Sequence, residues 1–510
     1  MSTFWNLIQA RLTVLANSLK LTASGCLVLL TVACGGVGTE SNVGERDFEN
    51  PLQIPPLLEP EIDADGRKTF DLTFMQGETE LLPGTTTETW GLNGSHLAPT
   101  IRADRGDDVQ IDVHNELDET TTLHWHGMHL PARMDGGPHQ MIHPGETWSP
   151  HWTIDQPAAS LWFHPHMHGE TAEHVYRGAA GMFIIDDPER DPQSLPSSYG
   201  IDDVPLIVQD KQFNSDGSLD FSTPMFSNLG MLGDEILVNG THTPRFEAQT
   251  SLVRFRVLNG SVARIYDFGF EDERDFWIIG SDTGLLESPV EADRLLLSPG
   301  ERAEIVVPVD PGDDVMLQSF APDLGMDAWN ERFNGGNDSF DILHLVAADD
   351  LTIAPELPEA LGVIERPDES GVAATREFSL SSSSSINNDS MEMERIDEVV
   401  EVDTTEIWEI SNDHGMIHSF HIHLIHFLIL DIDGDEPPPH LSGWKDTVLV
   451  PPGSTVRIIA EFKDYTDPDV PYMYHCHILQ HEDRGMMGQF VVVEPGNEVS
   501  SRIDHDHDDH

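Results

Sequence analysis

The chain has 510 residues and a formal net charge of -63, because 90 aspartate and glutamate residues stand against 27 lysine and arginine residues. Nucleic acid and anionic lipid are disfavoured as partners of such an acidic surface, since both carry negative charge themselves. The length is too great for one core and predicts roughly two to four domains.

The N-terminus carries the pattern of an export signal. Two basic residues precede a short apolar segment, residues 21–33, which ends at Cys34. Residues 1–33 resemble a bacterial lipoprotein signal, so we expect export to the periplasm or outer cell surface, with Cys34 as the lipid anchor. Thr31 stands where leucine is usual, which leaves plain secretion or a membrane anchor as alternatives. Residues 34–65, rich in Gly, Pro and acid, predict a tether.

From residue 66 onward the sequence predicts β-structure. Short alternating runs, such as residues 109–113, are separated by turns marked by Gly, Pro and Asn. A Pro-Gly turn followed by a strand-like run recurs three times at almost equal intervals, which indicates three related domains. We expect these domains at residues 66–188, 200–348 and 375–496, with a connector at 349–374 and an acidic, histidine-rich tail at 497–510.

Metal-ligand residue types gather in four clusters. Near the C-terminus, Cys476 stands between His475 and His477, and His481 and Met486 follow. Thiolate, imidazole and thioether donors form the ligand set of a blue-copper site. Alternate residues of a strand share a face, so His475 and His477 would point away from Cys476 and bind something else. The other three clusters are His124 and His126, then His164 and His166, then His418, His421 and His423.

In their order and spacing these motifs resemble the four signatures of multicopper oxidases, the family of laccases, bilirubin oxidases and periplasmic cuprous oxidases. The resemblance covers about residues 66–496 and implies an all-β fold of three cupredoxin-like Greek-key β-sandwich domains. It also implies four copper ions, held by the first and third domains, with dioxygen and a small reductant as partners. The middle domain, in which residues 200–340 hold a single histidine, would be a spacer or a wall.

The resemblance further implies a role for each motif residue. The type 1 copper would be held by His418, Cys476 and His481 with Met486 as axial ligand, the type 2 copper by His124 and His421, and the type 3 pair by His126, His164, His166, His423, His475 and His477. Asp135 and Glu482 match the family's proton donors, and the alternative for each is a solvated or helix-capping carboxylate.

These motifs predict a monomeric oxidase of laccase type that takes one electron from each phenolic or similar molecule and reduces dioxygen to water. The alternatives are a metal-ion oxidase for Cu(I) or Mn(II) in copper tolerance, and a copper-binding or storage protein, which the histidine-rich tail favours. The cuprous oxidases that the chain resembles have a long Met-rich insert before the third cluster, and this chain has only Met391 and Met393 in its place, which disfavours Cu(I). A copper-free structural or cell-division partner is disfavoured because every ligand position is filled.

Overall fold

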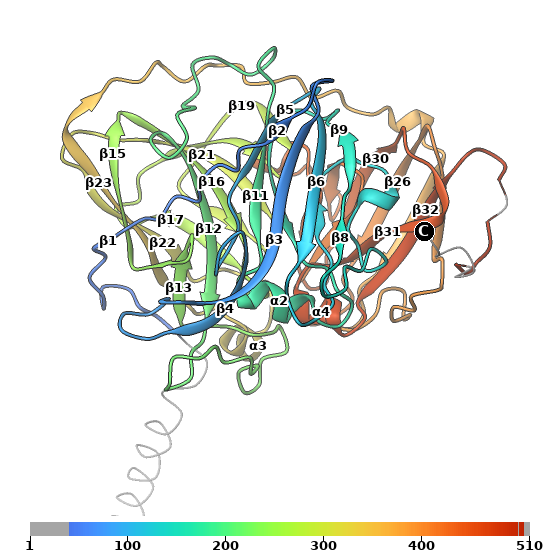
Figure 1. Ribbon diagram of the computed structural model, residues 1–510, viewed down its shortest axis with the longest axis horizontal. Helices are drawn as coiled ribbons and strands as arrows, with labels where there is room; N and C mark the ends of the chain where they lie inside the picture. The colour runs from blue at the N-terminus through green and yellow to red at the C-terminus, as the bar shows by residue number, and fades with distance from the viewer. Residues whose placement is uncertain (1–39, 498, 504–510) are drawn as a thin grey trace, which may run out of the picture. The chain divides into compact units, whose positions relative to one another are not determined.

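The computed structural model describes residues 40–497 and 499–503, and strands dominate it (Figure 1). The predicted all-β class is confirmed. The predicted signal segment, Cys34 and residues 504–510 of the predicted tail lie outside the described residues. None of the helices in the described part of the chain has the length and apolarity that a membrane crossing requires.

The six sheets of the described residues fall into three pairs, and each pair is drawn from one stretch of sequence apart from the short strand β1. The first pair consists of β2 (Glu61–Ile62), β3 (Lys68–Thr79), β4 (Thr87–Leu92), β6 (Asp108–Asn115), β8 (Thr147–Trp148) and β9 (His151–Thr153) in one sheet, and β5 (Ile101–Asp104), β11 (Gly181–Asp186), β10 (Ala159–His164) and β7 (His124–His126) in the other.

The second pair comes, apart from β1, from residues 203–352, which we call the middle segment. One sheet has the order β1 (Asn50–Pro51), β15 (Pro244–Thr250), β23 (Phe340–Thr352), β22 (Asp314–Phe320), β17 (Tyr266–Phe270) and β20 (Leu295–Leu297). The other has the order β14 (Thr241–His242), β13 (Glu235–Val238), β12 (Asp203–Lys211), β16 (Leu252–Asn259), β21 (Arg302–Pro308), β18 (Phe276–Ser281) and β19 (Gly284–Ala292).

The third pair comes from the C-terminal part of the described chain. Its sheets are β24 (Ala374–Ser379), β26 (Thr404–Ser411), β30 (Thr455–Phe462) and β28 (Phe427–Ile432), and β25 (Glu398–Glu401), β32 (Met487–Val493), β31 (Asp467–Cys476), β27 (His418–Ile422) and β29 (Thr447–Val450). The helices are α2 (Thr171–Arg177), α3 (Ala328–Phe333) and α4 (Leu479–Asp483), with 3-10 turns at Ala132–Met134, Glu369–Gly371 and Pro439–Leu441. This grouping agrees with three domains, whose boundaries stay a prediction.

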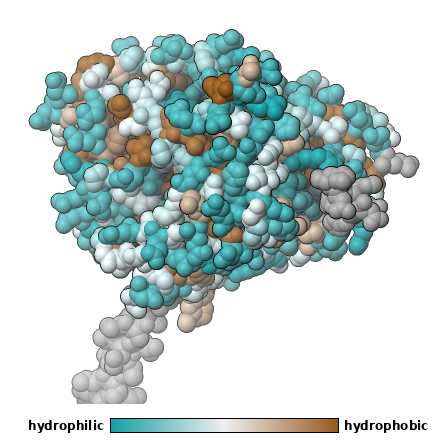
Figure 2. All heavy atoms as spheres, in the orientation of Figure 1, coloured by the Kyte–Doolittle hydropathy of each residue, from teal (hydrophilic) through white to brown (hydrophobic). Residues whose placement is uncertain are grey.

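Strand β6 shows how the alternating pattern produces the core. Val109, Ile111 and Val113 are fully buried, whereas the residues between them are partly exposed. Full burial of one such side chain stabilises the fold by about 1.5–3 kcal/mol, so a register slip of one residue would be costly. The visible outer face is covered mostly by hydrophilic residues (Figure 2), which agrees with the acidic composition.

Strand pairing sets the positions of the motif histidines. On β7 and β10, His124 lies opposite His164. On β27 and β31, His421 lies opposite His475, and Phe420 lies opposite Cys476. Residues directly opposite in an antiparallel pair share a face, so these pairs bring distant histidines together.

Candidate metal centre

The predicted ligand side chains are all buried, each with at most 1% of its surface exposed. Their potential ligand atoms form compact groups, in which all atoms lie within 4.8 Å of one another. The groups are His126, His164 and His477; His166, His423 and His475; His124, His421 and His423; and His418, Cys476 and His481. The structure therefore brings together histidines from the first and third sheet pairs.

In three of these rings one nitrogen is hydrogen-bonded and the other has no hydrogen-bond partner among the described residues. The Nδ1 atoms of His124, His164 and His421 lie 3.0, 2.8 and 2.9 Å from main-chain carbonyl oxygens, which fixes a hydrogen on Nδ1. Their Nε2 atoms are buried and have no hydrogen-bond partner among the described residues. Burial lowers the pKa of all three rings well below the usual value, so they stay neutral with a lone pair on Nε2.

In a second group the lone pairs face one another. His166 Nε2 and His423 Nε2 lie 3.1 and 3.3 Å from His475 Nε2. The Nδ1 atoms of His423 and His475 point outward, toward a carboxylate oxygen of Asp135 at 2.7 Å and the Cys476 carbonyl at 3.3 Å. A neutral imidazole has one donor and one acceptor nitrogen, so the inward nitrogens of His423 and His475 are acceptors that a cation between the rings would pair. The residues therefore fit a metal ion.

Cys476 lies in a separate group with mixed donors. Its Sγ atom lies 3.5 Å from His418 Nδ1 and 3.6 Å from His481 Nδ1. The Cys476 N–H donates to the Met486 carbonyl at 3.0 Å, and both side chains belong to one buried cluster. Burial raises the pKa of the Cys476 thiol to about 12. A thiolate would need a cation beside it here, which this donor set can hold.

The outer nitrogens of the two imidazoles beside Cys476 lead toward the surface. His418 Nε2 lies 3.3 Å from Nδ1 of the half-buried His414. His481 Nε2 donates to the carbonyl of Asn228 at 2.9 Å. Asn228 is exposed and lies on a loop of the middle segment, where the Asn334 side chain accepts its N–H at 2.9 Å. The middle segment therefore covers one side of the cysteine group.

Two exposed aromatic rings lie on or beside this loop. Phe226 and Trp329 are 56% and 61% exposed, and their ring centroids are 6.0 Å apart. Phe333 supports them, with its centroid 5.3 Å from Phe226 and 4.8 Å from Trp329. Phe226 has a φ of 73°, a left-handed conformation that is rare for a bulky residue. Strain of this kind clusters at functional sites, and Phe226 is two residues from Asn228.

The two predicted catalytic carboxylates are both buried against ring nitrogens. Asp135 Oδ2 lies 2.7 Å from His423 Nδ1, and burial raises the pKa of this carboxyl well above its usual range. Glu482 lies 3.1 Å from His475 Nδ1 and 3.4 Å from His166 Nδ1. Burial would raise the pKa of Glu482, but the neighbouring His166 and His475 rings hold it below its usual value. Neither carboxylate is solvated, which argues against that alternative.

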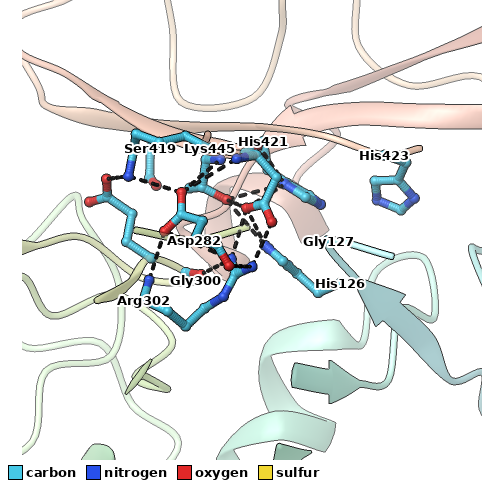
Figure 3. Close-up of polar contacts among 12 residues, drawn as sticks. His126, Gly127, Asp282, Gly300, Arg302, Ser419, His421, His423 and Lys445 are labelled. Atoms are coloured by element: carbon cyan, nitrogen blue, oxygen red, sulfur yellow. Dashed lines mark hydrogen bonds and ion pairs between the residues drawn. The ribbon is translucent and has the colours of Figure 1, made fainter. Parts of the chain in front are cut away.

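A buried ionic network joins the middle segment to the histidines, and the sequence reading missed it (Figure 3). Arg302 forms an ion pair with Asp446 at 2.7 Å. Lys445 contacts Asp282 at 2.9 Å and Glu301 at 3.0 Å. All five side chains are nearly or fully buried. Charged residues at the ends of strands are usually exposed to solvent. The only sequence signal for this buried network was that Lys445 and Asp446 directly precede an apolar run.

Comparisons with known proteins give a consistent result. Residues 74–190 and 364–496 match two family models, both described as Multicopper oxidase. The chain is 34% identical over 451 residues to the multicopper oxidase mco of Staphylococcus haemolyticus, covering 87% of this chain and 93% of that protein. It is 35% identical over 449 residues to the cell division protein FtsP of Xenorhabdus nematophila, with coverage of 87% and 93%.

A solved structure is also similar throughout. The crystal structure of a laccase from Pediococcus acidilactici superposes with a TM-score of 0.79 at 37% identity, covering 88% of this chain and 95% of that chain. This likeness confirms the predicted cupredoxin-like sandwich fold.

Proposed function

The chain belongs to the multicopper oxidase family, and from this premise we propose that it is an oxidase of laccase type. It takes single electrons from phenols or aromatic amines and reduces dioxygen to water. Three domains with the predicted boundaries, export, a lipid anchor at Cys34 and a monomeric state belong to the same proposal.

Four copper ions match the donor groups of the described residues. Copper held there would supply one-electron redox chemistry and bind dioxygen. Peptide bonds join Cys476 to His475 and His477, so the backbone connects the cysteine group to the larger histidine group. The proposed holders are His418, Cys476, His481 and Met486 for type 1, His124 and His421 for type 2, and His126, His164, His166, His423, His475 and His477 for the type 3 pair.

Asp135 and Glu482 have complementary proton roles in this proposal. Burial favours a proton on Asp135, whose Oδ1 atom has no hydrogen-bond partner in the described part of the chain. Glu482 favours the ionised form and lies against His166 and His475. One carboxyl can therefore hold a proton beside His423, and the other can accept one beside His166 and His475.

The exposed rings of Phe226 and Trp329 are the reason for proposing an aromatic reductant. These rings lie beside Asn228, whose carbonyl accepts from His481 at 2.9 Å. A planar donor stacked on Phe226 would be two residues from Asn228, whose carbonyl accepts from a ligand of the cysteine group. The net charge of -63 favours neutral or cationic aromatic molecules over anionic ones.

The test is dioxygen uptake by the copper-loaded protein with phenols, an aromatic diamine, Cu(I), Fe(II) and Mn(II). We expect uptake with the aromatic donors. Replacing Phe226 and Trp329 with Ala should raise their KM about tenfold, since each aromatic contact contributes about 0.5–1.5 kcal/mol. The matched control is Val363→Ala, because Val363 is also apolar and is 87% exposed.

Other results would point to the alternatives. Uptake with metal ions alone would indicate a metal-ion oxidase. Copper binding without uptake would indicate storage. Absence of copper binding would indicate a structural role, such as the name of the FtsP relative suggests.

A further inference from the structure

We propose that Asp446 is a positioning residue that fixes which nitrogen His126 and His421 present to copper, and that Arg302 of the middle segment holds Asp446 in place. This inference rests on the proposed function in so far as it concerns copper. It gives the middle segment, which contributes none of the predicted ligands, a role in shaping the metal centre.

The two rings are stacked but oppositely oriented. Their centroids are 3.7 Å apart with an interplanar angle of 12°. His126 Nε2 lies 3.0 Å from Asp446 Oδ1, whereas His421 Nδ1 lies 2.9 Å from the Asp446 carbonyl oxygen. The opposite nitrogens, His126 Nδ1 and His421 Nε2, are buried without a hydrogen-bond partner in residues 40–497 and 499–503. One residue therefore contacts both rings, one from each end of the chain.

Every partner atom at Asp446 enforces the same hydrogen placement. An ionised carboxylate and a carbonyl can only accept, so His126 must carry its hydrogen on Nε2 and His421 on Nδ1. Thr447 Oγ1 donates its single hydrogen to Asp446 Oδ1 at 2.8 Å. The same hydroxyl lies 3.1 Å from His126 Nε2 and 3.1 Å from His421 Nδ1, and there it can only accept. The lone pairs are thus directed to His126 Nδ1 and His421 Nε2.

Arg302 leaves Asp446 no freedom to turn. Its Nη1 and Nη2 atoms donate to Asp446 Oδ1 and Oδ2 at 2.8 and 2.7 Å, a bidentate pair. The remaining guanidinium hydrogens go to the carbonyl oxygens of Ser160, Gly300 and Asp282 at 2.9, 3.0 and 2.8 Å. Figure 3 shows Arg302 reaching from the middle segment toward His126 and His421. Both members of the pair are fully enclosed by all three segments.

The charges of the network also favour a cation nearby. Arg302 and Lys445 are opposed by the carboxylates of Asp282, Glu301 and Asp446, which leaves one buried negative charge in excess within this network. Burying an uncompensated charge is costly. Asp446 is the member that contacts the rings, so the metal ions held by His126 and by His421 would compensate the excess across those rings.

The test compares Asp446→Asn with Glu301→Gln in the copper-loaded protein. Both changes neutralise a buried carboxylate of the same network, but Glu301 contacts Lys445 at 3.0 Å and accepts hydrogen bonds from Ser298 rather than from an imidazole ring. An asparagine can donate to His126 Nε2 and so move the ring hydrogen to Nδ1. We expect Asp446→Asn to weaken copper binding outside the cysteine group about 10- to 100-fold, whereas Glu301→Gln keeps its copper.

Copper per chain, the blue absorption of the cysteine group and the type 2 signal in electron paramagnetic resonance are the readouts. A retained blue band shows that the variant has folded. If Asp446→Asn fails to fold, Thr447→Val removes the shared hydroxyl without exposing a charge, and it should also weaken the type 2 signal. Equal copper contents in the Asp446 and Glu301 variants, or an unaffected Thr447→Val, would overturn the inference. A wild-type protein without copper would instead refute the proposed function.

Discussion

Gly127, which follows the first histidine pair, lies against the Asp446–Arg302 ion pair and offers a direct test of its rigidity. A Cβ atom at Gly127 would lie 2.4 Å from Asp446 Oδ2 and 2.7 Å from Arg302 Nη2. Its φ is 85°, so an alanine there would also be strained. Gly145 is the matched control, because its φ is 83° and no described heavy atom lies within 4 Å of its Cβ position.

The difference between the two variants measures the cost of moving the Asp446–Arg302 ion pair, together with Leu161 Cδ2, which lies 3.0 Å from the same Cβ position. Left-handed backbone costs an alanine roughly 1–2 kcal/mol, which both variants share. Disrupting a buried ion pair costs about 3–5 kcal/mol, which only Gly127→Ala incurs. Denaturant unfolding of the copper-free proteins measures the gap, and copper content should fall in Gly127→Ala alone. Equal unfolding free energies for the two variants would show that the pair moves cheaply and would refute the reasoning.

Cys476→Ser should abolish the intense blue absorption and keep the type 2 signal; a surviving blue band would refute the assignment of this thiolate. Lys211→Met should stabilise the protein most below pH 7, because burial lowers the pKa of Lys211 from 10.5 to about 7. Between these two pH values only the unfolded chain binds the proton, so the stability of the wild-type protein rises with pH. The gain should shrink toward pH 10.5 in unfolding measured across pH, and a constant gain would contradict it. Asp135→Asn should slow reoxidation by dioxygen about 10²- to 10⁴-fold with normal anaerobic bleaching of the blue band; stopped-flow mixing that found slow bleaching instead would move Asp135 to the donor side.

The sequence predicted the features that depend on short spacing. Alternation in residues 109–113 predicted a half-buried strand, and Val109, Ile111 and Val113 are fully buried in β6. The spacing of His124 and His126 predicted two rings on one face of a strand. Both kinds of inference need only the two-residue period of a strand, which is a local property of the chain.

Long-range register and buried charge could not be predicted in this way. Nothing local shows that His421 lies opposite His475, since β27 and β31 are separated by three other strands in sequence. Asp446 and Arg302 are charged residues of the kind usually found at the surface, and only the tertiary structure shows that they are buried. The middle segment was expected to be a spacer or a wall because residues 200–340 hold a single histidine. Its Asn228, however, accepts a hydrogen bond from the predicted ligand His481, and its Arg302 pairs with Asp446, which contacts two further predicted ligands.

The division of ligands between both ends of the chain links metal binding to the docking of its parts. The larger histidine group is complete only when β7 and β10 of the first segment meet β27 and β31 of the third. Without a cation, docking encloses several unpaired ring nitrogens and the excess negative charge of the Asp446 network, which opposes the closed arrangement. A cation that binds only the docked state stabilises it by RT ln(1 + [L]/Kd), about 2.7 kcal/mol at a hundredfold excess over Kd. Arg302 of the middle segment reduces the free-energy cost of docking even without a metal ion, because its positive charge compensates Asp446. The part of the chain without predicted ligands therefore helps to stabilise the enclosed site.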